Sequence, residues 1–300
     1  MTSALLILLN LLLFLLLAPL FDGVVRRVTA RIQSRRGPPL IQPYYDLFKL
    51  LGKENLSAGN WAFHLAPILA LASVMAAIAM TPFAFRAHYL AQHHDIVTLI
   101  YLLTLGGVSV LLGALASRNI FASIGASREM VTMIMVEPIL AMTLIFGAVK
   151  VQSLGIAPVF SGVAEQGYAW SVVLMLALYL AALQAFVGRQ PFDLAEAESE
   201  IVEGPFIEYS GPNYALFKLY MMLKQMFYAA LFVTIFLPFL RTGYLLLDLP
   251  ALLVGVSIVF LLIALVGATN PRLRIDQAVR YYAGLGVGAI LAVTLSVYGW

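Results

Sequence analysis

Eight long apolar segments constrain this 300-residue chain more than any other feature of its sequence. Each has close to the roughly 20 residues that an α-helix needs to cross the hydrocarbon core of a bilayer. They cover residues 3–21, 64–85, 96–116, 130–149, 170–187, 214–240, 244–268 and 278–298. The sequence therefore predicts an all-α, polytopic membrane protein with about eight transmembrane helices.

The composition agrees, because 62% of the residues are hydrophobic and only 11% are charged. Soluble domains carry roughly 25% charged residues, so lipid must cover part of this apolar surface. The first run, 4–20, has no preceding basic residue and no small-x-small cleavage site, and we expect it to be a retained span. Residues 1–300 are predicted to form a single membrane domain without internal repeats.

The basic residues predict the orientation, because Lys and Arg are enriched in cytoplasmic connections. Thirteen fall in or beside the connections 22–63, 117–129, 188–213 and 269–277, whereas only Arg86, Lys150 and Arg241 fall on the opposite side. If the richer side is inside, the N-terminus lies outside. The same inside connections hold most of the polar sequence, which is typical of a docking surface.

Six of the fifteen acids lie between the fifth and sixth spans, at Asp193, Glu196, Glu198, Glu200, Glu203 and Glu208. If this segment is helical, Asp193, Glu196, Glu200 and Glu203 share one face. Each ionised carboxylate costs roughly 2.5–3.5 kcal/mol at the centre of a bilayer, so these acids must face water, hold protons or pair with cations. The segment is either a solvated acidic loop or a half-buried row suited to proton transfer.

Two ionisable residues lie within predicted spans. Glu137 is deep in the fourth span, where a carboxylate either acts in function or is protonated and hydrogen-bonded to a neighbouring helix. Lys224, in the sixth span, requires a carboxylate partner or a water-filled cavity, whereas Lys218 is close enough to the inside edge to reach water.

The connection after the first span combines a basic turn with an amphipathic segment. Arg31, Arg35 and Arg36 precede Gly-Pro-Pro, and the following residues place apolar side chains at helical spacing with Asp46 and Lys49 beside them. This pattern predicts an interfacial helix, which would serve either partner docking or attraction to anionic lipid.

The chain has no cysteine, and we find no nucleotide-binding loop and no nucleophile–base constellation. We therefore expect no metal ligands, no cofactor and no catalytic residues in this chain itself.

Three segments, 31–53, 125–137 and 191–211, together resemble subunit 1 of respiratory complex I. The string Pro-Phe-Asp-Leu-x-Glu-Ala-Glu-x-Glu followed by Glu-Tyr-Ser-Gly is highly specific. The chain resembles more closely the membrane subunit of group 4 membrane-bound nickel–iron hydrogenases of the formate hydrogenlyase and hydrogenase-4 type. The sixth span, for instance, has Lys224 and no acid, whereas the complex I branch typically has a glutamate there.

The resemblance implies a membrane anchor and coupling subunit of an energy-converting hydrogenase in the cytoplasmic (inner) membrane of a prokaryote. It would link electron transfer in a docked soluble arm to proton or sodium translocation. Its partners would be the hydrogenase large and small subunits, an iron–sulfur subunit and antiporter-like membrane subunits, with the nickel–iron site and iron–sulfur clusters in those partners. A complex I quinone-site subunit and a passive anchor are the alternatives.

By position, the resemblance assigns two sets of residues. The ion-transfer set is Glu137, Asp193, Glu196, Glu198, Glu200, Glu203, Glu208 and Lys224. The set at the junction with the arm is Arg31, Arg35, Arg36, Asp46, Lys49, Arg128 and Glu129.

Overall fold

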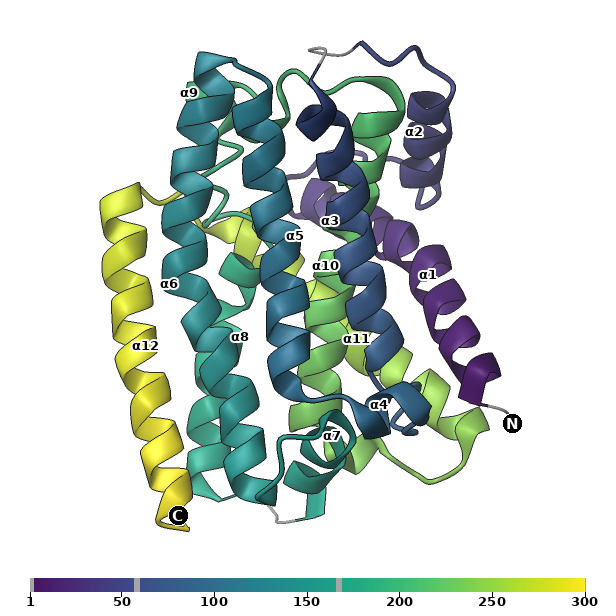
Figure 1. Cartoon of the computed structure of the whole chain (residues 1–300), viewed down its shortest axis with the longest axis vertical. Coiled ribbons are helices and arrows are strands. Elements are labelled where there is room, and N and C mark those ends of the chain that lie inside the picture. The colour runs from purple at the N-terminus through teal and green to yellow at the C-terminus, as the bar shows by residue number, and fades with distance from the viewer. Residues whose placement is uncertain (1–2, 57–59, 166–168, 300) are drawn as a thin grey trace.

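A computed structural model describes residues 3–56, 60–165 and 169–299, which form helices and no β-strand apart from two isolated bridges. The long helices lie side by side along one direction (Figure 1). The elements are α1 (Ser3–Ile32), α2 (Gln42–Leu51), α3 (Trp61–Met80), α4 (Tyr89–His93), α5 (Ile96–Ala116), α6 (Ile120–Val151), α7 (Ile156–Glu165), α8 (Trp170–Phe186), α9 (Glu198–Ile201), η1 (Gly204–Phe206), α10 (Gly211–Phe236), η2 (Pro238–Leu240), α11 (Leu245–Thr269) and α12 (Ile275–Val297).

Each of the eight predicted apolar segments forms a helix, which confirms the all-α membrane fold. Among the described residues, seven helices are long and apolar enough to cross a membrane. The eighth, α8, has 17 residues, or roughly 26 Å at 1.5 Å per residue. The chain leaves the helix at Gly188, whose φ is +62°. Because α8 is short, the loop that follows it begins inside the bundle rather than beyond it.

Two helices extend further than the sequence predicted. α1 continues to Ile32 and α6 begins at Ile120, so parts of the expected connections 22–63 and 117–129 are helical. The side chain of Asn119 caps α6 by accepting a hydrogen bond from the Phe121 N–H at 2.8 Å. A helix can project charged turns beyond the hydrocarbon region, so hydropathy marks the membrane boundary rather than the end of the helix.

The predicted interfacial helix is present as α2, beside α1 and α10 (Figure 1). Tyr45, Phe48 and Leu51 are exposed on its outer side, and Pro43 is buried on its inner side. An exposed row of large apolar side chains next to a bundle of apolar helices suits the boundary between headgroups and acyl chains.

The centre of the bundle is α10, which packs against α1, α3, α8 and α11. Nearly every side chain from Met222 to Phe236 is buried, whereas the surrounding helices expose large apolar residues such as Leu8, Val254 and Ile290. Apolar residues that face outward from a helical bundle need lipid around them.

The bundle has two distinct ends (Figure 1). We call the end that carries α2 and α9 the α2 end, and the end that carries α4, α7 and both chain termini the α4 end. The basic connections predicted to lie on one side gather at the α2 end, together with the acidic loop.

Candidate functional site

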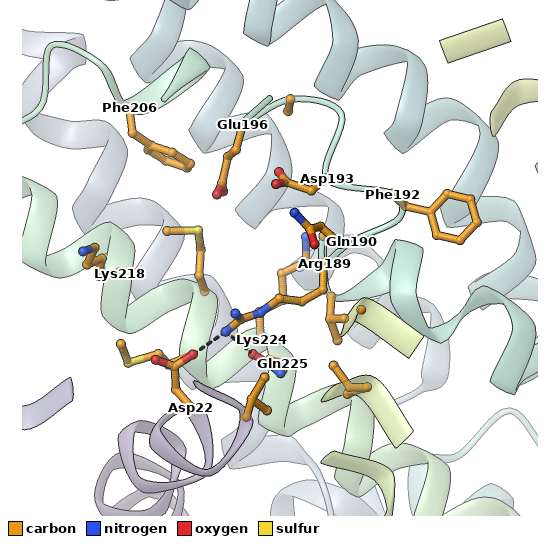
Figure 2. A pocket seen from close by; sticks show the side chains of 18 of the residues that line it. Asp22, Arg189, Gln190, Phe192, Asp193, Glu196, Phe206, Lys218, Lys224 and Gln225 are labelled. Atoms are coloured by element: carbon orange, nitrogen blue, oxygen red, sulfur yellow. Dashed lines mark hydrogen bonds and ion pairs between the residues drawn. The ribbon is translucent and has the colours of Figure 1, made fainter. Parts of the chain in front are cut away.

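A cavity of about 420 Å³ lies in the α2 half of the bundle, between α1, α6, α10, α11 and the loop 187–210 (Figure 2). Its walls include five carboxylates and four cations. These charged residues are Asp22, Arg26, Glu129, Arg189, Asp193, Glu196, Glu203, Lys218 and Lys224. Charges of both signs around one space in a membrane protein are typical of a water-filled or ion-conducting site.

The loop that carries the acids is largely irregular, so the condition of a helical segment, under which its acids would share one face, is not met. Only Glu198–Ile201 and Gly204–Phe206 are helical. Val202 and Gly204 have φ values of +62° and +50°, which interrupt a right-handed helix. The backbone folds back on itself at Gly204, where a Cβ atom would lie 2.0 Å from the carbonyl oxygen of Ala195.

Replacing Gly204 by Ala is expected to destabilise the chain by at least about 2 kcal/mol, because the new methyl group must displace backbone and the left-handed φ is unfavourable for alanine. Thermal unfolding in detergent, followed by size-exclusion chromatography, would measure the loss. Gly286→Ala is the matched control, since a Cβ there meets no atom within 4 Å. Equal thermal stability of the two variants would contradict the close approach at Gly204.

The predicted acids divide between the cavity and the surface. Asp193, Glu196 and Glu203 line the cavity. Glu200 points away and forms an ion pair of 2.6 Å with Arg128. Glu208 is exposed and accepts a hydrogen bond of 2.5 Å from Asn119. The four-residue face that a helical segment would have had is therefore not formed, because Glu200 pairs with Arg128 instead.

The side chain of Glu198 lies outside the described part of the structure. Its predicted role in ion transfer stays a prediction.

Glu196 reaches from the loop toward the interior of the cavity (Figure 2). Burial raises the pKa of its carboxyl to about 8, and the negative charges of Asp193 and Glu129 add to the effect while Arg189 opposes it. A carboxyl with this pKa exchanges its proton near neutral pH, which suits reversible proton transfer.

Asp193 is held by a partner from another part of the chain. Arg272, in the connection between α11 and α12, donates to its Oδ2 at 2.8 Å. In the same region the Leu273 N–H donates to the carbonyl of Pro191 at 3.0 Å. These contacts fix the start of the acidic loop against the α11–α12 connection.

A series of ion pairs that the sequence did not reveal ties the cavity to α2. Arg189 donates to the buried carboxylate of Asp22 and, at 3.0 Å, to Gln225 Oε1 (Figure 2). Arg26 contacts Asp22 at 2.8 Å through Nε and Asp46 at 3.0 Å through Nη1. The series joins the interfacial helix, α1, the acidic loop and the central helix.

The sequence held only a partial signal for these partners. Asp22 directly follows the first apolar run, and Arg26 lies four residues later on the same helix face. That spacing predicts the Asp22–Arg26 pair. Nothing local relates Asp22 to Arg189, which is 167 residues away along the chain.

The position of Lys224 agrees with the prediction that this residue needs a water-filled cavity or a carboxylate partner. It lines the cavity, and its Nζ lies 6.0 Å from the centre of the Tyr220 ring. Its charge also acts on Glu137 of α6, which is itself half-buried and outside the cavity wall. Lys224 is therefore the cavity residue whose charge reaches Glu137. Lys218 lines the same cavity, 4.8 Å from the ring centre of Tyr214.

The predicted junction residues are not all on the surface. Arg31, Arg35, Arg36 and Lys49 are exposed at the α2 end. By contrast, Glu129 lines the cavity.

Asp46 and Arg128 have partners within the chain, as described above. Burial alone would raise the pKa of Asp46, but hydrogen bonds from Gln42 and Arg26 outweigh it and hold that pKa below its usual value. The part of this end that is free to meet another protein is therefore predominantly basic. Within the described ranges, no group of three His, Cys, Asp or Glu side chains is arranged to hold a metal ion.

The family of the chain follows from its match to known proteins. The sequence matches the NADH dehydrogenase family over residues 4–297. The chain belongs to this family. Among relatives, formate hydrogenlyase subunit 4 of Escherichia coli (strain K12) is 35% identical over 288 residues, which cover 93% of this chain and 94% of that protein. Hydrogenase-4 component C of the same strain is 36% identical over 269 residues, 87% of this chain and 85% of that protein.

This NADH dehydrogenase family member also resembles two further groups. A subunit of the NADH-quinone oxidoreductase of Dehalococcoides mccartyi (strain CBDB1) is 31% identical over 273 residues, 87% of this chain and 76% of that protein. A chain of the membrane-bound sulfane sulfur reductase, an archaeal respiratory membrane complex, matches with a TM-score of 0.84 and 28% identity, over 98% of this chain and 99% of that one. The resemblance expected from the three sequence segments is confirmed, and the chain is a multi-pass membrane protein.

Proposed function

We propose that this protein is the membrane anchor and coupling subunit of an energy-converting nickel–iron hydrogenase complex. In this role it links electron transfer in a docked soluble arm to translocation of protons or sodium ions. Its two relatives at 35% and 36% identity are named as subunits of formate hydrogenlyase and hydrogenase-4, which supports the hydrogenase branch.

One observation carries the proposal: a cavity lined by five carboxylates and four cations lies in the α2 half of the bundle, with Lys224 of the central helix in its wall. An arm docked on the α2 end would lie against one side of this cavity. Protons released or consumed by its chemistry would enter past Glu203 and Glu196, and Lys224 would relay the change in charge to Glu137. Alternating acids and cations of this kind suit proton relays.

The partners follow from this role. The exposed arginines Arg31, Arg35 and Arg36 would contact the arm, which consists of the hydrogenase large and small subunits and an iron–sulfur subunit. Antiporter-like membrane subunits would receive the coupling. The nickel–iron site and the iron–sulfur clusters belong to those partners, and this chain supplies no cysteine to ligate them.

The excess of Lys and Arg at the α2 end supports an orientation with that end in the cytoplasm. The N-terminus, at the α4 end (Figure 1), would then lie outside the cytoplasmic membrane of a prokaryote.

Replacing Glu137 by Gln in the intact complex is expected to lower proton uptake per hydrogen molecule by about tenfold, because the amide keeps the shape but cannot carry a proton. Hydrogen formation with an artificial electron donor is expected to stay at the level of the unaltered complex. Proteoliposomes with an internal pH dye and a hydrogen electrode measure both quantities. The matched control is Glu54→Gln, an exposed glutamate at the α2 end, which should change neither.

The same experiment separates the alternatives. Unchanged proton uptake in Glu137→Gln would reject the relay and favour a passive anchor, which needs no titrating group. A quinone-site role, suggested by the relatives named as NADH-quinone oxidoreductase subunits, would give electron transfer to added quinone that a quinone-site inhibitor blocks. A complex that forms sulfide rather than hydrogen would place the chain with the sulfane sulfur reductase.

A further inference from the structure

A second hollow, of about 750 Å³, lies at the α4 end, opposite the acidic loop. Its walls come from the turn before α4, from α6, α7 and α10, and from the connection between α10 and α11. Two arginines, Arg86 and Arg241, line it together with the uncharged polar residues Gln92, Ser161 and Thr234. None of the described residues that line it is a carboxylate, so these residues together carry a positive charge.

Its two arginines are unusual because this end of the bundle is poor in cations. Only Arg86, Lys150 and Arg241 fall there, and two of these three line the same hollow. Arg86 donates to the carbonyl of Gly243 at 3.0 Å. Arg241 is exposed and makes no hydrogen bond or ion pair with the described part of the chain. Two like charges around one space are stabilised by an anion between them.

Asp248, in the first turn of α11, does not supply that anion. Asp248 is buried, and its Oδ1 accepts hydrogen bonds from the Thr242 N–H at 2.7 Å and the Gly243 N–H at 3.2 Å. It therefore caps the turn that precedes α11 rather than pairing with an arginine. An anion held between the two arginines would therefore come from outside the described residues.

The rest of the wall is apolar, and the hollow lies at the level of lipid headgroups. Phe85, Val151 and Phe160 line it beside the arginines. At the same end of the bundle Trp170 and Tyr244 are 77% and 72% exposed. Exposed aromatic residues at the ends of membrane helices mark the interface between headgroups and hydrocarbon. A ligand of this hollow is therefore negatively charged at one end and apolar at the other.

We propose that this hollow binds one anionic phospholipid, with its phosphodiester between Arg86 and Arg241 and its acyl chains against Phe85, Val151 and Phe160. A guanidinium offers paired N–H donors that match phosphate oxygens, so two arginines bind a phosphodiester strongly. A zwitterionic lipid carries a positively charged ammonium group beside its phosphate, which the arginines repel, so an anionic lipid is preferred. The site gives the protein a lipid preference at the face remote from the acidic cavity.

Native mass spectrometry of the full-length chain, released from detergent with equal amounts of phosphatidylglycerol and phosphatidylcholine, tests the proposal. One phosphatidylglycerol is expected to stay bound preferentially. The double variant Arg86→Gln/Arg241→Gln should weaken that binding by about 30-fold, from the contribution of two basic residues at an anionic surface. The matched control, Arg35→Gln/Arg36→Gln, removes two exposed arginines at the α2 end and should retain it.

Four results would overturn the proposal. The first is equal retention of the two lipids, and the second is unchanged phosphatidylglycerol binding in the glutamine variant. The third is displacement of the lipid by millimolar inorganic phosphate, which would assign the hollow to a free anion. The variant Arg86→Lys/Arg241→Lys keeps both charges, so retained lipid binding in it shows that the glutamine variant lost charge and not its fold. The fourth result is loss of phosphatidylglycerol binding in both the lysine and the glutamine variant, which would reject a site based on charge.

Discussion

Replacing Asp22 by Asn is expected to lower the free energy of unfolding of the full-length chain by about 3 kcal/mol, since removing one partner of a buried ion pair leaves the other charge uncompensated. The side chain of Asp22 is only 3% exposed, and the change leaves Arg189 with the amide of Gln225 but no carboxylate, whereas Arg26 keeps Asp46. Denaturant unfolding in detergent micelles, followed by circular dichroism, would measure the loss.

The control for this prediction is Asp276→Asn, in the first turn of α12, where the carboxylate is exposed. Its removal should cost less than about 1 kcal/mol, the usual contribution of an acid near a helix N-terminus. The double variant Asp22→Asn/Arg189→Gln should be less destabilised than the sum of the two single changes, because both remove the same pair. Additive losses, or an Asp22 effect no larger than that of Asp276, would show that the pair does not stabilise the fold.

Raising the pH above about 8 is expected to reduce coupled proton uptake by the complex about tenfold per pH unit, because the carboxyl of Glu196, with a pKa of about 8, then loses the proton it must deliver. Glu196→Gln should lower uptake at every pH and remove this midpoint. The ratio of proton uptake to hydrogen formed, measured in proteoliposomes between pH 6 and pH 9.5, tests it. An unchanged pH midpoint in Glu196→Gln would assign the titration to another group.

The raised pKa of Glu196 also predicts how the stability of the folded chain changes with pH. The folded chain keeps the proton of Glu196 up to about pH 8, whereas the unfolded chain releases it near the ordinary value of 4.5. The folded state thus holds more protons between these values, so its stability falls as pH rises from about 4.5 to about 8 and then levels. Glu196→Gln should remove this part of the pH dependence.

The sequence was most informative where local rules apply. Hydropathy located all eight apolar helices, and amphipathic spacing located α2 with Asp46 and Lys49 on it. The desolvation cost of a charge correctly implied that Lys224 needs a polar cavity. Whether the acidic segment is helical could not be decided from the sequence, because the positive φ angles of Val202 and Gly204 that interrupt it leave no side-chain periodicity.

What the sequence by itself determined is the class of protein, the positions of the membrane helices and the presence of many acids at one end. These features depend on residues that are neighbours along the chain. Only the tertiary structure decided which acids face the cavity, and it placed Asp22 against Arg189 and Asp193 against Arg272. Such pairs join residues 167 and 79 positions apart. Their formation depends on how whole helices pack, since a charge in the interior is stable only where the fold brings it a partner or water.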